Sequence, residues 1–588
     1  MRFEGRARRI GGSLLVAWLL LQARAWSFPG VIVGKDGSPR KVHTTHEVMM
    51  LKDDVSVITV MVDYEGPIDS FAVLMPVPQD VTLQRVQAVK REFLSRLEQL
   101  SAPRYHAFYE KDPCEPGQVE QDWDVRYEAN ESGFLAPSFM PPPERNWIVS
   151  NEISMATKPV FKRNESEFRF QLLQYQEPSA LEAWLLARGY RASPEALSSL
   201  ARGLEGRKKL LVAEVNAERA ELVGNGGLQL GGIRYFTRES VNRIDATLGL
   251  SNSAGVQDLF VYVLHPSQRY QAKNYPNAFL PSNVGVEPSA EERVAPLYNA
   301  LFDAKLAKAP EGFVTEFVWP TYGCGEPCPN APLTLYELMS LGGDVMEAQF
   351  IPKGARFPDP GPESNEEKQE FELHLLDKSP AERAKARIEH QQDRRELARR
   401  RAVIARQRYM MTRLHYRFDR NALPRDIELT AAEPIQGGIG IPQGSQGSLF
   451  TGTRPAQESR FQMRFVSLFA WTKGFQCSAP ARWRWGRRWK SLDAVRRKVW
   501  LAEDLPRNGR DQSILAQLIR TPLAELGLAP APTPPPTAAA APTSSTKHSG
   551  CSLAGPGSTS NVATFSALII ALSAIGRRRR RSRSARTN

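Results

Sequence analysis

His43, His46 and Glu47 are the first residues whose chemistry suggests a site, because imidazole and carboxylate groups are common zinc ligands. A helical zinc site of the HExxH type has two histidines four residues apart, with the glutamate directly after the first, whereas here the spacing is three. The residues that follow favour a strand, on which His43 and His46 face opposite sides. We therefore expect two ordinary polar residues at the start of a strand, and the sequence predicts no metal and no other cofactor.

Motifs for nucleophilic catalysis and phosphate binding are missing from the sequence. No G-x-S-x-G run marks a serine hydrolase, and the glycine-rich segments 224–227 and 437–440 lack the Lys-Ser/Thr pair of a phosphate-binding loop. Two catalytic carboxylates can lie far apart in a sequence and leave no local pattern. No residue is therefore assigned to catalysis, and an extracytoplasmic hydrolase with dispersed acidic catalytic residues stays open as an alternative.

Arginine and tryptophan alternate in a short segment after residue 481. The candidate contact residues in it are Arg482, Trp483, Arg484, Trp485, Arg487 and Arg488. Interleaved side chains of these two types can lie at a lipid headgroup boundary or stack on bases. One interpretation is contact with an anionic envelope glycolipid or polysaccharide, with nucleic acid less favoured. The simpler interpretation is a strand whose tryptophans pack inward while its arginines face water.

The N-terminus has the order of a secretory signal peptide. Four arginines precede residue 10, an apolar run covers residues 14–21, and Ala23-Arg24-Ala25 provides a small-x-small cleavage site. An apolar run of this length is too short to span a bilayer, which takes roughly 20 residues as a helix. We expect residues 1–25 to be removed and the mature chain to begin near Trp26.

The C-terminus has the composition of a linker followed by an anchor. Residues 526–550 are rich in Pro, Ala and Thr, and the segment 551–588 contains Cys551, a short apolar stretch at 562–575 and five consecutive arginines from Arg577. This order resembles the MYXO-CTERM sorting tail of surface proteins from myxobacteria and their relatives. The resemblance implies that a sorting or processing protease acts on the tail and that Cys551 is the processed, lipid-anchored residue. A plain transmembrane tail is the alternative, although a helix over 562–575 would be a thin anchor.

Net charge and cysteine content describe the remaining body. Of the formal charge of +13, residues 1–25 carry +4 and residues 577–588 carry +7, which leaves +2 for residues 26–576. A nearly neutral body gives no general electrostatic reason to bind nucleic acid. Apart from Cys551, four cysteines remain, and an even number in an exported chain favours disulfides, here in one of three pairings. The disulfide candidates are Cys114, Cys324, Cys328 and Cys477.

Strand-like segments dominate the pattern along the body. Residues 48–51, 55–62 and 71–78 are apolar and rich in β-branched types, with turn residues between them, and they predict an antiparallel meander. Further strands are expected at 168–173, 209–215, 233–236, 244–250, 259–264, 314–319, 413–418, 427–430 and 460–469, and helices at 93–100, 180–189 and 291–308. The predicted fold class is α+β, with mainly antiparallel sheet, several helices and two subdomains.

A charged segment interrupts this pattern. Ser379-Pro380-Ala381-Glu382 is a capping box with proline at the first helical position, and the run that follows is dense in Arg, Glu and Gln without an apolar stripe. We expect one charged projecting helix near 379–408. The predicted domain boundaries are 26–350 for an N-terminal α+β part, 351–410 for a charged helical insertion and 411–525 for a C-terminal part.

Several short motifs in the body, taken in order, are similar to those of the bacterial domain-of-unknown-function 2330 family. They lie at 71–78, 100–104, 112–114, 258–264, 274–277, 328–329, 332–334 and 412–415. The resemblance covers most of residues 28–485. It implies an exported, secreted or surface-bound protein, and it implies no known activity.

The leading hypothesis from the sequence is an exported, envelope-anchored protein whose body is a non-catalytic binding or structural module. Its expected partners are the membrane, through the C-terminal tail, and a sorting or processing protease. An envelope glycolipid or polysaccharide is the further partner considered, and nucleic acid is not expected.

Overall fold

The computed structural model describes six stretches of the chain: 29–114, 167–321, 333–346, 363–418, 426–486 and 511–528, together with Ala502 and Leu505. Residues 39, 68–69, 176, 207–208, 224–226, 246–247, 310, 364, 377 and 407 inside these stretches are excepted. The predicted signal peptide, the linker from residue 529 on and the tail with Cys551 lie outside the described residues, as do Cys324, Cys328, Arg487 and Arg488. The first predicted linker residues, Leu526 and Leu528, are instead buried in the core.

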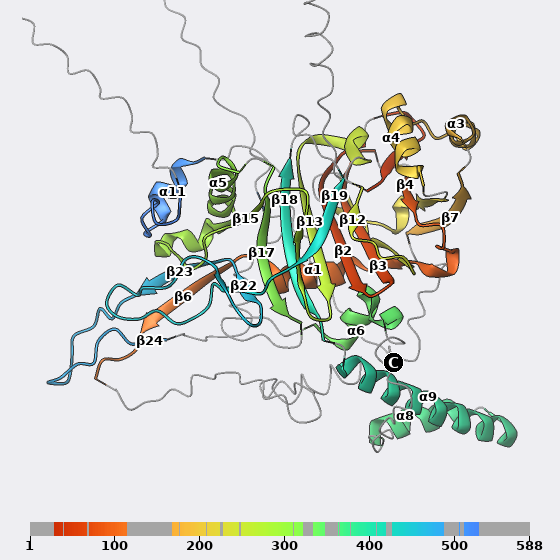
Figure 1. The fold of residues 1–588 in the computed structure, drawn as a ribbon. Coiled ribbons are helices and arrows are strands. Elements are labelled where there is room, and N and C mark those ends of the chain that lie inside the picture. The colour runs from red at the N-terminus through yellow and green to blue at the C-terminus, as the bar shows by residue number, and fades with distance from the viewer. Residues whose placement is uncertain are drawn as a thin grey trace, which may run out of the picture. The chain divides into compact units, whose positions relative to one another are not determined.

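The largest sheet has 13 strands and mixed pairing (Figure 1). β2 (Val42–Lys52) and β3 (Val55–Glu65) form an antiparallel hairpin. β2 also pairs in parallel with β13 (Ser253–His265), while β13 and β17 (Phe313–Pro320) flank β18 (Met410–Phe418) antiparallel to it. Its other strands are β5 (Val86–Val89), β9 (Glu221–Val223), β10 (Gly227–Gln229), β11 (Gly232–Thr237), β15 (Asn277–Phe279), β20 (Ile435–Gly437), β21 (Arg454–Pro455) and β22 (Arg460–Gln462). With the helices described below, the predicted α+β class is confirmed.

The third strand of the expected meander does not continue the hairpin. β4 (Phe71–Val77) lies instead in a second sheet of order β1-β4-β8-β7, between β1 (Val31–Gly34) and β8 (Lys209–Val215), with β7 (Phe168–Gln174) at the edge. All seven residues of β4 are buried, because one face packs into the core shared with the large sheet and the other packs beneath α3 (Pro178–Ala187) and α4 (Pro194–Leu204). An apolar strand of this kind needs cover on both faces, which an edge position in a meander does not give.

Two smaller sheets complete the body. One has the order β12-β19-β14, from β12 (Arg243–Ile244), β19 (Ile427–Ala432) and β14 (Arg269–Ala272). The other has the order β16-β23-β6-β24, from β16 (Val284–Gly285), β23 (Arg464–Phe469), β6 (Arg104–Glu110) and β24 (Trp485–Gly486). The strand expected over 460–469 is therefore divided at Met463 between two sheets.

The strand expected at 244–250 is also wrong beyond Ile244. The chain instead forms a 3-10 turn at Gly249–Asn252. The Asn252 side chain accepts a hydrogen bond from Ile32 N at 2.8 Å and donates to Ile32 O at 2.9 Å and Arg40 O at 3.0 Å. The buried Asn252 side chain thus occupies the place beside β1 that a longer strand would need.

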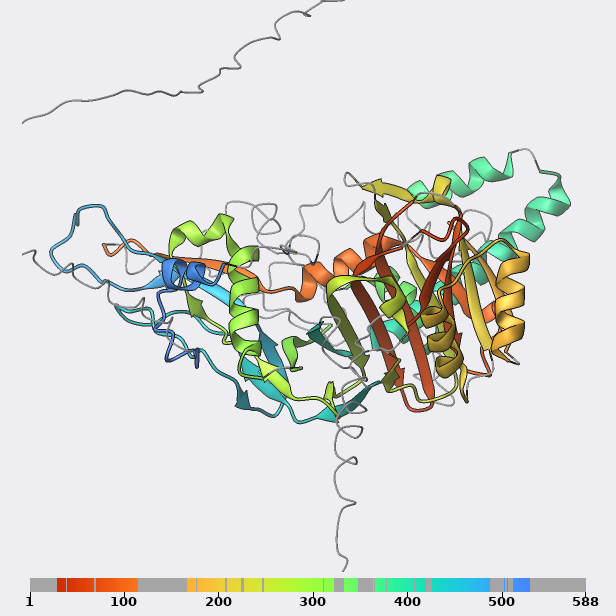
Figure 2. The same cartoon turned by 90° about the horizontal axis from the view of Figure 1, so that it is seen from above.

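Helices cover the sheets and extend from them. They are α1 (Arg91–Ser101), α3 and α4, α5 (Val294–Leu306), α6 (Leu335–Leu338), α8 (Asn365–Leu375), α9 (Pro380–Arg406) and α11 (Ser513–Leu518). The charged segment forms α9, whose start has the expected reciprocal cap: Ser379 N donates to Glu382 Oε2 at 2.9 Å and Glu382 N donates to Ser379 Oγ at 3.4 Å. α8 and α9 lie side by side, away from the sheets (Figures 1 and 2).

All described residues belong to one compact unit. The predicted division into two subdomains and the predicted boundaries stay predictions. Across the described ranges, no helix combines the length and apolar character that a bilayer span requires.

Candidate functional site

Ionisable side chains from three adjacent strands and two helices, α1 and α5, meet in the interior of the large sheet. Arg413, His415 and Arg417 occupy alternate positions on β18, so all three point to one face. The register places Arg417 opposite Asp258 of β13. On the other side, the pairing of β17 with β18 shifts between Thr315 and Phe317, and Glu316 is the extra residue of this bulge.

His415 lies at the centre of the group. Its Nε2 is 2.8 Å from Asp258 Oδ1, and its Nδ1 is 2.8 Å from Glu316 Oε1. Each ring nitrogen of His415 therefore faces a carboxylate oxygen of a neighbouring strand. Phe260 and Phe302 pack against the ring with centroid distances of 4.1 and 4.2 Å.

Arg417 binds the outer side of the group. Its Nε donates to Asp258 Oδ1 at 2.6 Å, its Nη1 to Asp303 Oδ1 at 2.9 Å and its Nη2 to Asn299 Oδ1 at 2.8 Å. Burial opposes ionisation of Asp258, but the charge of Arg417 and the hydrogen bond from His415 outweigh it and hold the pKa of this carboxyl well below its usual range. Asp258 is therefore an anion near neutral pH.

Arg413 binds the inner side of the group. Its Nε is 2.7 Å from Glu316 Oε2, its Nη2 is 4.0 Å from Glu98 Oε1, and its guanidinium carbon lies 4.6 Å from the centre of the Phe260 ring. Tyr298 of α5 donates to Glu316 Oε1 and lies 2.9 Å from His415 Nδ1. We call this set the ionic network; it consists of Glu98, Asp258, Tyr298, Asn299, Asp303, Glu316, Arg413, His415 and Arg417.

The ionic network is enclosed. The His415 side chain has no exposed surface and Glu316 has 1%, while Asp258 and Asp303 at the outer end retain 17% and 23%. A general acid needs a proton to give and access to a reacting group, and Asp258 is held ionised against Arg417. The arrangement thus neutralises buried charge and fixes the register of three strands against α5.

The two histidines near the N-terminus occupy different environments. His43 Nε2 contacts Glu65 Oε2 at 2.7 Å, whereas His46 is buried beside Phe260 and Tyr262, with centroid distances of 5.3 and 6.1 Å. Burial, followed by the charges of Arg91 and Arg413, holds the pKa of His46 well below its usual range. In the described part of the chain, no group of three or more His, Cys, Asp or Glu side chains is placed to hold a metal ion.

The predicted cysteine and Arg/Trp candidates meet at the end of the β6–β24 pair. Cys114 and Cys477 form a disulfide with a Cα–Cα distance of 5.4 Å. Close to it, Arg482 makes a two-pronged ion pair with Glu110, through Nε to Oε1 at 2.6 Å and Nη2 to Oε2 at 3.1 Å. We call residues 109–114 and 469–486 the β24 tip. Oxidation of Cys324 and Cys328 stays a prediction.

Glu110 organises the β24 tip from within. Its side chain is fully covered, and its two oxygens also accept hydrogen bonds from Trp471 N at 2.8 Å and Trp483 N at 2.7 Å. Burial opposes ionisation of Glu110, but hydrogen bonds from Arg482 and from the two amides lower its pKa. One carboxylate thus holds two segments of the tip together and remains charged.

The alternation of Arg and Trp is only partly reflected in the side-chain positions. Trp485 packs inward and donates from Nε1 to Gly444 O at 2.9 Å, while Trp483 keeps 37% of its surface exposed. Arg484 does not face water freely, because it donates to Ala481 O at 3.1 Å and to Asp112 O. The simpler sequence interpretation describes Trp485 and fails for Trp483 and Arg484.

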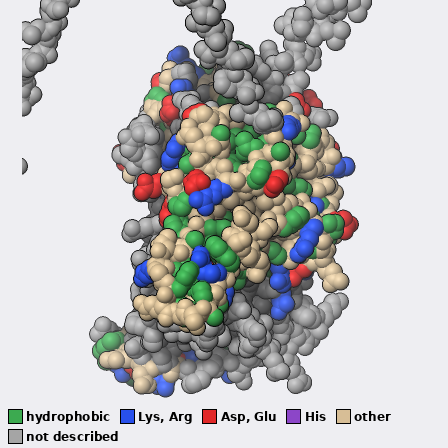
Figure 3. Space-filling model, turned by 90° about the vertical axis from the view of Figure 1, so that its left-hand side faces the viewer, with side chains coloured by type: hydrophobic (Ala, Val, Ile, Leu, Met, Phe, Trp, Pro, Cys, Tyr) green, Lys and Arg blue, Asp and Glu red, His purple; other side chains and the backbone are tan. Residues whose placement is uncertain are grey.

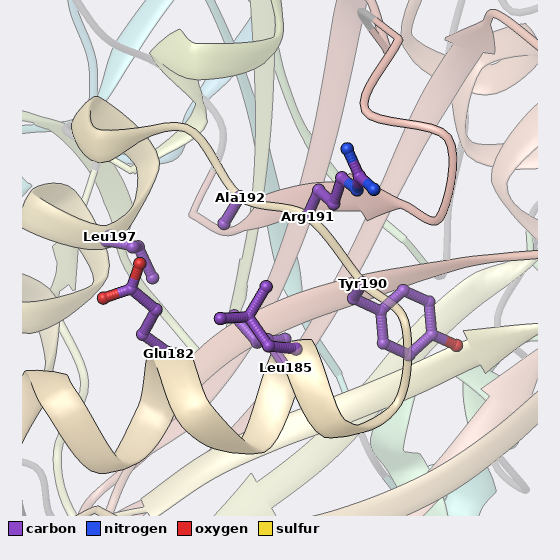
Figure 4. Close-up of a pocket in the computed structure, with 7 residues that line it drawn as sticks. Glu182, Leu185, Tyr190, Arg191, Ala192 and Leu197 are labelled. Atoms are coloured by element: carbon purple, nitrogen blue, oxygen red, sulfur yellow. The ribbon is translucent and has the colours of Figure 1, made fainter.

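A small hollow lies beside α3, and none of the predicted site residues lines it. Figure 4 shows Glu182 and Leu185 of α3 on one side and Tyr190 and Arg191 of the following connection on the other. The space that they line has a volume of about 320 Å³. Burial, with a smaller contribution from Glu214, raises the pKa of Tyr190 to about 12.

Sequence reasoning missed the ionic network as a site. A signal was present, because the otherwise uncharged β18 carries three basic side chains in strict alternation. Such residues on a buried strand need buried partners. The partners, Asp258 and Glu316, are more than 90 residues away in sequence and could not be assigned to them without the fold.

Comparison with protein families gives one match. The sequence model of a bacterial family described as "Uncharacterized protein conserved in bacteria (DUF2330)" matches residues 24–430, well over half of the chain. The chain belongs to the DUF2330 family. Comparison with curated proteins gives no match, and comparison with solved structures gives none either.

The extent of the DUF2330 match differs from the expected resemblance, which reached residue 485. The ionic network lies entirely within the matched residues, on motifs 258–264 and 412–415 among others. In the β24 tip, β6 and Cys114 lie within the DUF2330 match, whereas β23, Cys477 and the Arg/Trp segment lie beyond it.

Proposed function

We propose that this DUF2330 protein is exported and anchored to the cell envelope, and that its body is a non-catalytic binding or structural module. The observation that carries the proposal is the state of the interior carboxylates. Asp258 and Glu316 are bound by Arg417, Arg413 and His415, with Glu316 enclosed and Asp258 only 17% exposed, which suits a stabilising role.

Location outside the cytoplasm has separate support. The order of the N-terminal residues is that of a signal peptide, and the order after Cys551 is that of a sorting tail. The Cys114–Cys477 bond joins residues 363 positions apart, and bonds of this kind persist in oxidising compartments. Anchoring would take place through Cys551, because 562–575 is short for a permanent span.

An extracytoplasmic hydrolase is the alternative. The partial exposure of Asp258 and Asp303 is the feature that favours it, since both carboxylates reach toward the surface. Against it, Arg417 binds both groups, and two carboxylates that share one arginine are poorly suited to give up or receive a proton. The non-catalytic module is therefore the better-supported function.

Anchoring is tested by cell fractionation together with mass spectrometry of the C-terminal peptide. Cys551→Ala should release the protein or leave an unprocessed precursor, while the neighbouring Ser552→Ala should behave as the unmodified protein. A lipidated C-terminal peptide should carry two acyl groups, because a single chain anchors only reversibly. Unchanged retention of Cys551→Ala with residues 577–588 still attached would show a plain transmembrane tail instead.

A further inference from the structure

The β24 tip presents aromatic and cationic side chains in one rigid layer. The Arg482 guanidinium lies 4.2 Å from the centre of the Trp483 ring and 5.0 Å from that of Phe475, and Lys473 lies 5.6 Å from that of Trp471. Phe475 and Trp483 keep 45% and 37% of their surface exposed. Figure 3 faces the side on which β24 lies in Figure 1, and it shows hydrophobic side chains beside Lys and Arg.

Three features hold this layer in place. The disulfide ties Cys477 to Cys114, and backbone hydrogen bonds join Ala481 N to Pro113 O at 2.8 Å and Lys111 N to Arg484 O at 2.7 Å. Glu110 accepts hydrogen bonds from the backbone N–H groups of Trp471 and Trp483, at the two ends of the loop 472–482. The layer is thus assembled before any ligand arrives, and a preorganised surface loses little entropy on binding.

Trp483 is also held in a costly backbone conformation. Its φ is +65°, in the left-handed region that favours glycine, and the hydrogen bond from its N–H to Glu110 helps to hold it there. Strained residues of this kind gather at ligand-binding positions. A large aromatic side chain kept partly exposed at such a position has no evident role in the core.

Charge in the β24 tip favours an anionic partner. The tip carries four cationic side chains, Lys111, Lys473, Arg482 and Arg484, against the two carboxylates Glu110 and Asp112, so its formal charge is 4 − 2 = +2 even though Arg482 is paired with the enclosed Glu110. Arg484 is bonded to carbonyls, which leave its charge uncompensated. The Arg482 Nη1 group donates to no residue in the described part of the chain, so it can meet a ligand anion.

We propose that the β24 tip binds an anionic polysaccharide of the cell surface, with sugar rings stacked on Trp483 and Phe475 and their carboxylates or phosphates on Lys473 and Arg482. A pyranose ring presents an apolar face of C–H groups that matches an exposed indole. Insertion into a bilayer fits less well, because it requires side chains to reach about 5–10 Å into the headgroup region, whereas more than half of each ring is covered by the protein. This inference rests on the proposed binding function and names its ligand class.

The test uses the full chain in detergent and polygalacturonate as the probe, with neutral dextran for comparison. Trp483→Gly is the main variant, because glycine adopts the left-handed conformation freely and the substitution should not unfold the tip. Phe450→Ala is the matched control, since Phe450 is 55% exposed on a loop outside the tip. Every variant carries the same arginine-rich tail, so differences between variants report on the tip.

We expect Trp483→Gly to weaken polygalacturonate binding at least tenfold, as loss of a central aromatic contact does (about 1.4 kcal/mol). Lys473→Ala should weaken binding less, with a loss that shrinks at high salt, and Phe450→Ala should change nothing. Absence of binding to polygalacturonate, equal binding by Trp483→Gly, or equal binding to dextran would each overturn the proposal.

Two further readouts separate this inference from the proposed function. Binding to phosphatidylglycerol vesicles that falls in Trp483→Gly, without binding to polygalacturonate, would assign the tip to lipid and overturn the polysaccharide inference. Shortening of polygalacturonate during the assay would contradict the non-catalytic module while leaving the binding inference intact. If the protein fractionates with the envelope but does not bind polygalacturonate, only the proposed ligand class is overturned, and the proposed envelope function stands.

Discussion

Removal of Arg417 is expected to destabilise the fold severely. Arg417→Met keeps much of the side-chain volume but leaves Asp258, Asp303 and Asn299 without their shared donor. Asp258 is largely buried and, among the described residues, retains His415 as its only side-chain partner. Breaking a buried ion pair from one side costs about 3–5 kcal/mol, a large part of the roughly 5–15 kcal/mol by which a domain is stable.

The energetic coupling is worked out from a double-mutant cycle. Asp258→Asn should also destabilise, because Arg417 then loses its closest acceptor, and the variant with both changes should cost clearly less than the sum of the two. A coupling of about 0.5–3 kcal/mol is expected for groups in one network. Arg387→Met is the control, since its pair with Glu372 is well exposed and should contribute no more than about 1 kcal/mol.

Urea unfolding followed by tryptophan fluorescence measures these differences on a chain that ends at Ala531, which retains every described element. A shift in the midpoint at constant slope reports stability. A loss below about 1 kcal/mol for Arg417→Met, or strict additivity of the two substitutions, would refute the structural role assigned to the ionic network.

Three further outcomes are expected. Because burial lowers the pKa of His46, the unfolded chain binds one more proton than the folded chain below about pH 6.5, so the free energy of unfolding should fall toward lower pH by up to about 1.4 kcal/mol per pH unit. His46→Phe should flatten this dependence between pH 6.5 and 5, and an unchanged dependence would contradict a buried, neutral His46. Thiol labelling without reductant should leave Cys114 and Cys477 unmodified, and their joint replacement by Ser should cost about 2–5 kcal/mol, whereas labelling of both would exclude the bond. Glu110→Gln should make the loop 472–482 of the β24 tip more sensitive to protease without a change in the cooperativity of global unfolding, since a neutral amide oxygen accepts more weakly from Arg482 and the two backbone N–H groups than a carboxylate does. Unchanged cleavage would argue against the organising role of Glu110.

Local patterns predicted many elements and few of their partners. The hairpin of β2 and β3 follows from two apolar runs around Asp53, which adopts a left-handed φ of 51° as a turn residue. The same apolar density in β4 could not reveal that this strand is covered on both faces and lies in another sheet. Pairing depends on distant segments, and periodicity in one segment does not encode it.

The candidate site shows the same limit. Alternating basic side chains on β18 were visible, but Glu316 joins them only because a bulge turns it toward His415. In the β24 tip, the sequence identified the right segment and not the roles within it, because Glu110 and Trp471, far from the Arg/Trp run in sequence, decide how Trp483 and Arg482 are held.

Hydrogen exchange at β18 tests most directly whether the ionic network is a closed structural core. If it is, the amides of Thr412, Leu414 and Tyr416 should exchange only through global unfolding, with a free energy equal to that from urea unfolding. A site that reacts with a substrate must open in the native state. Exchange of these amides several kcal/mol below the global free energy, with His415 becoming accessible to solvent, would contradict the account.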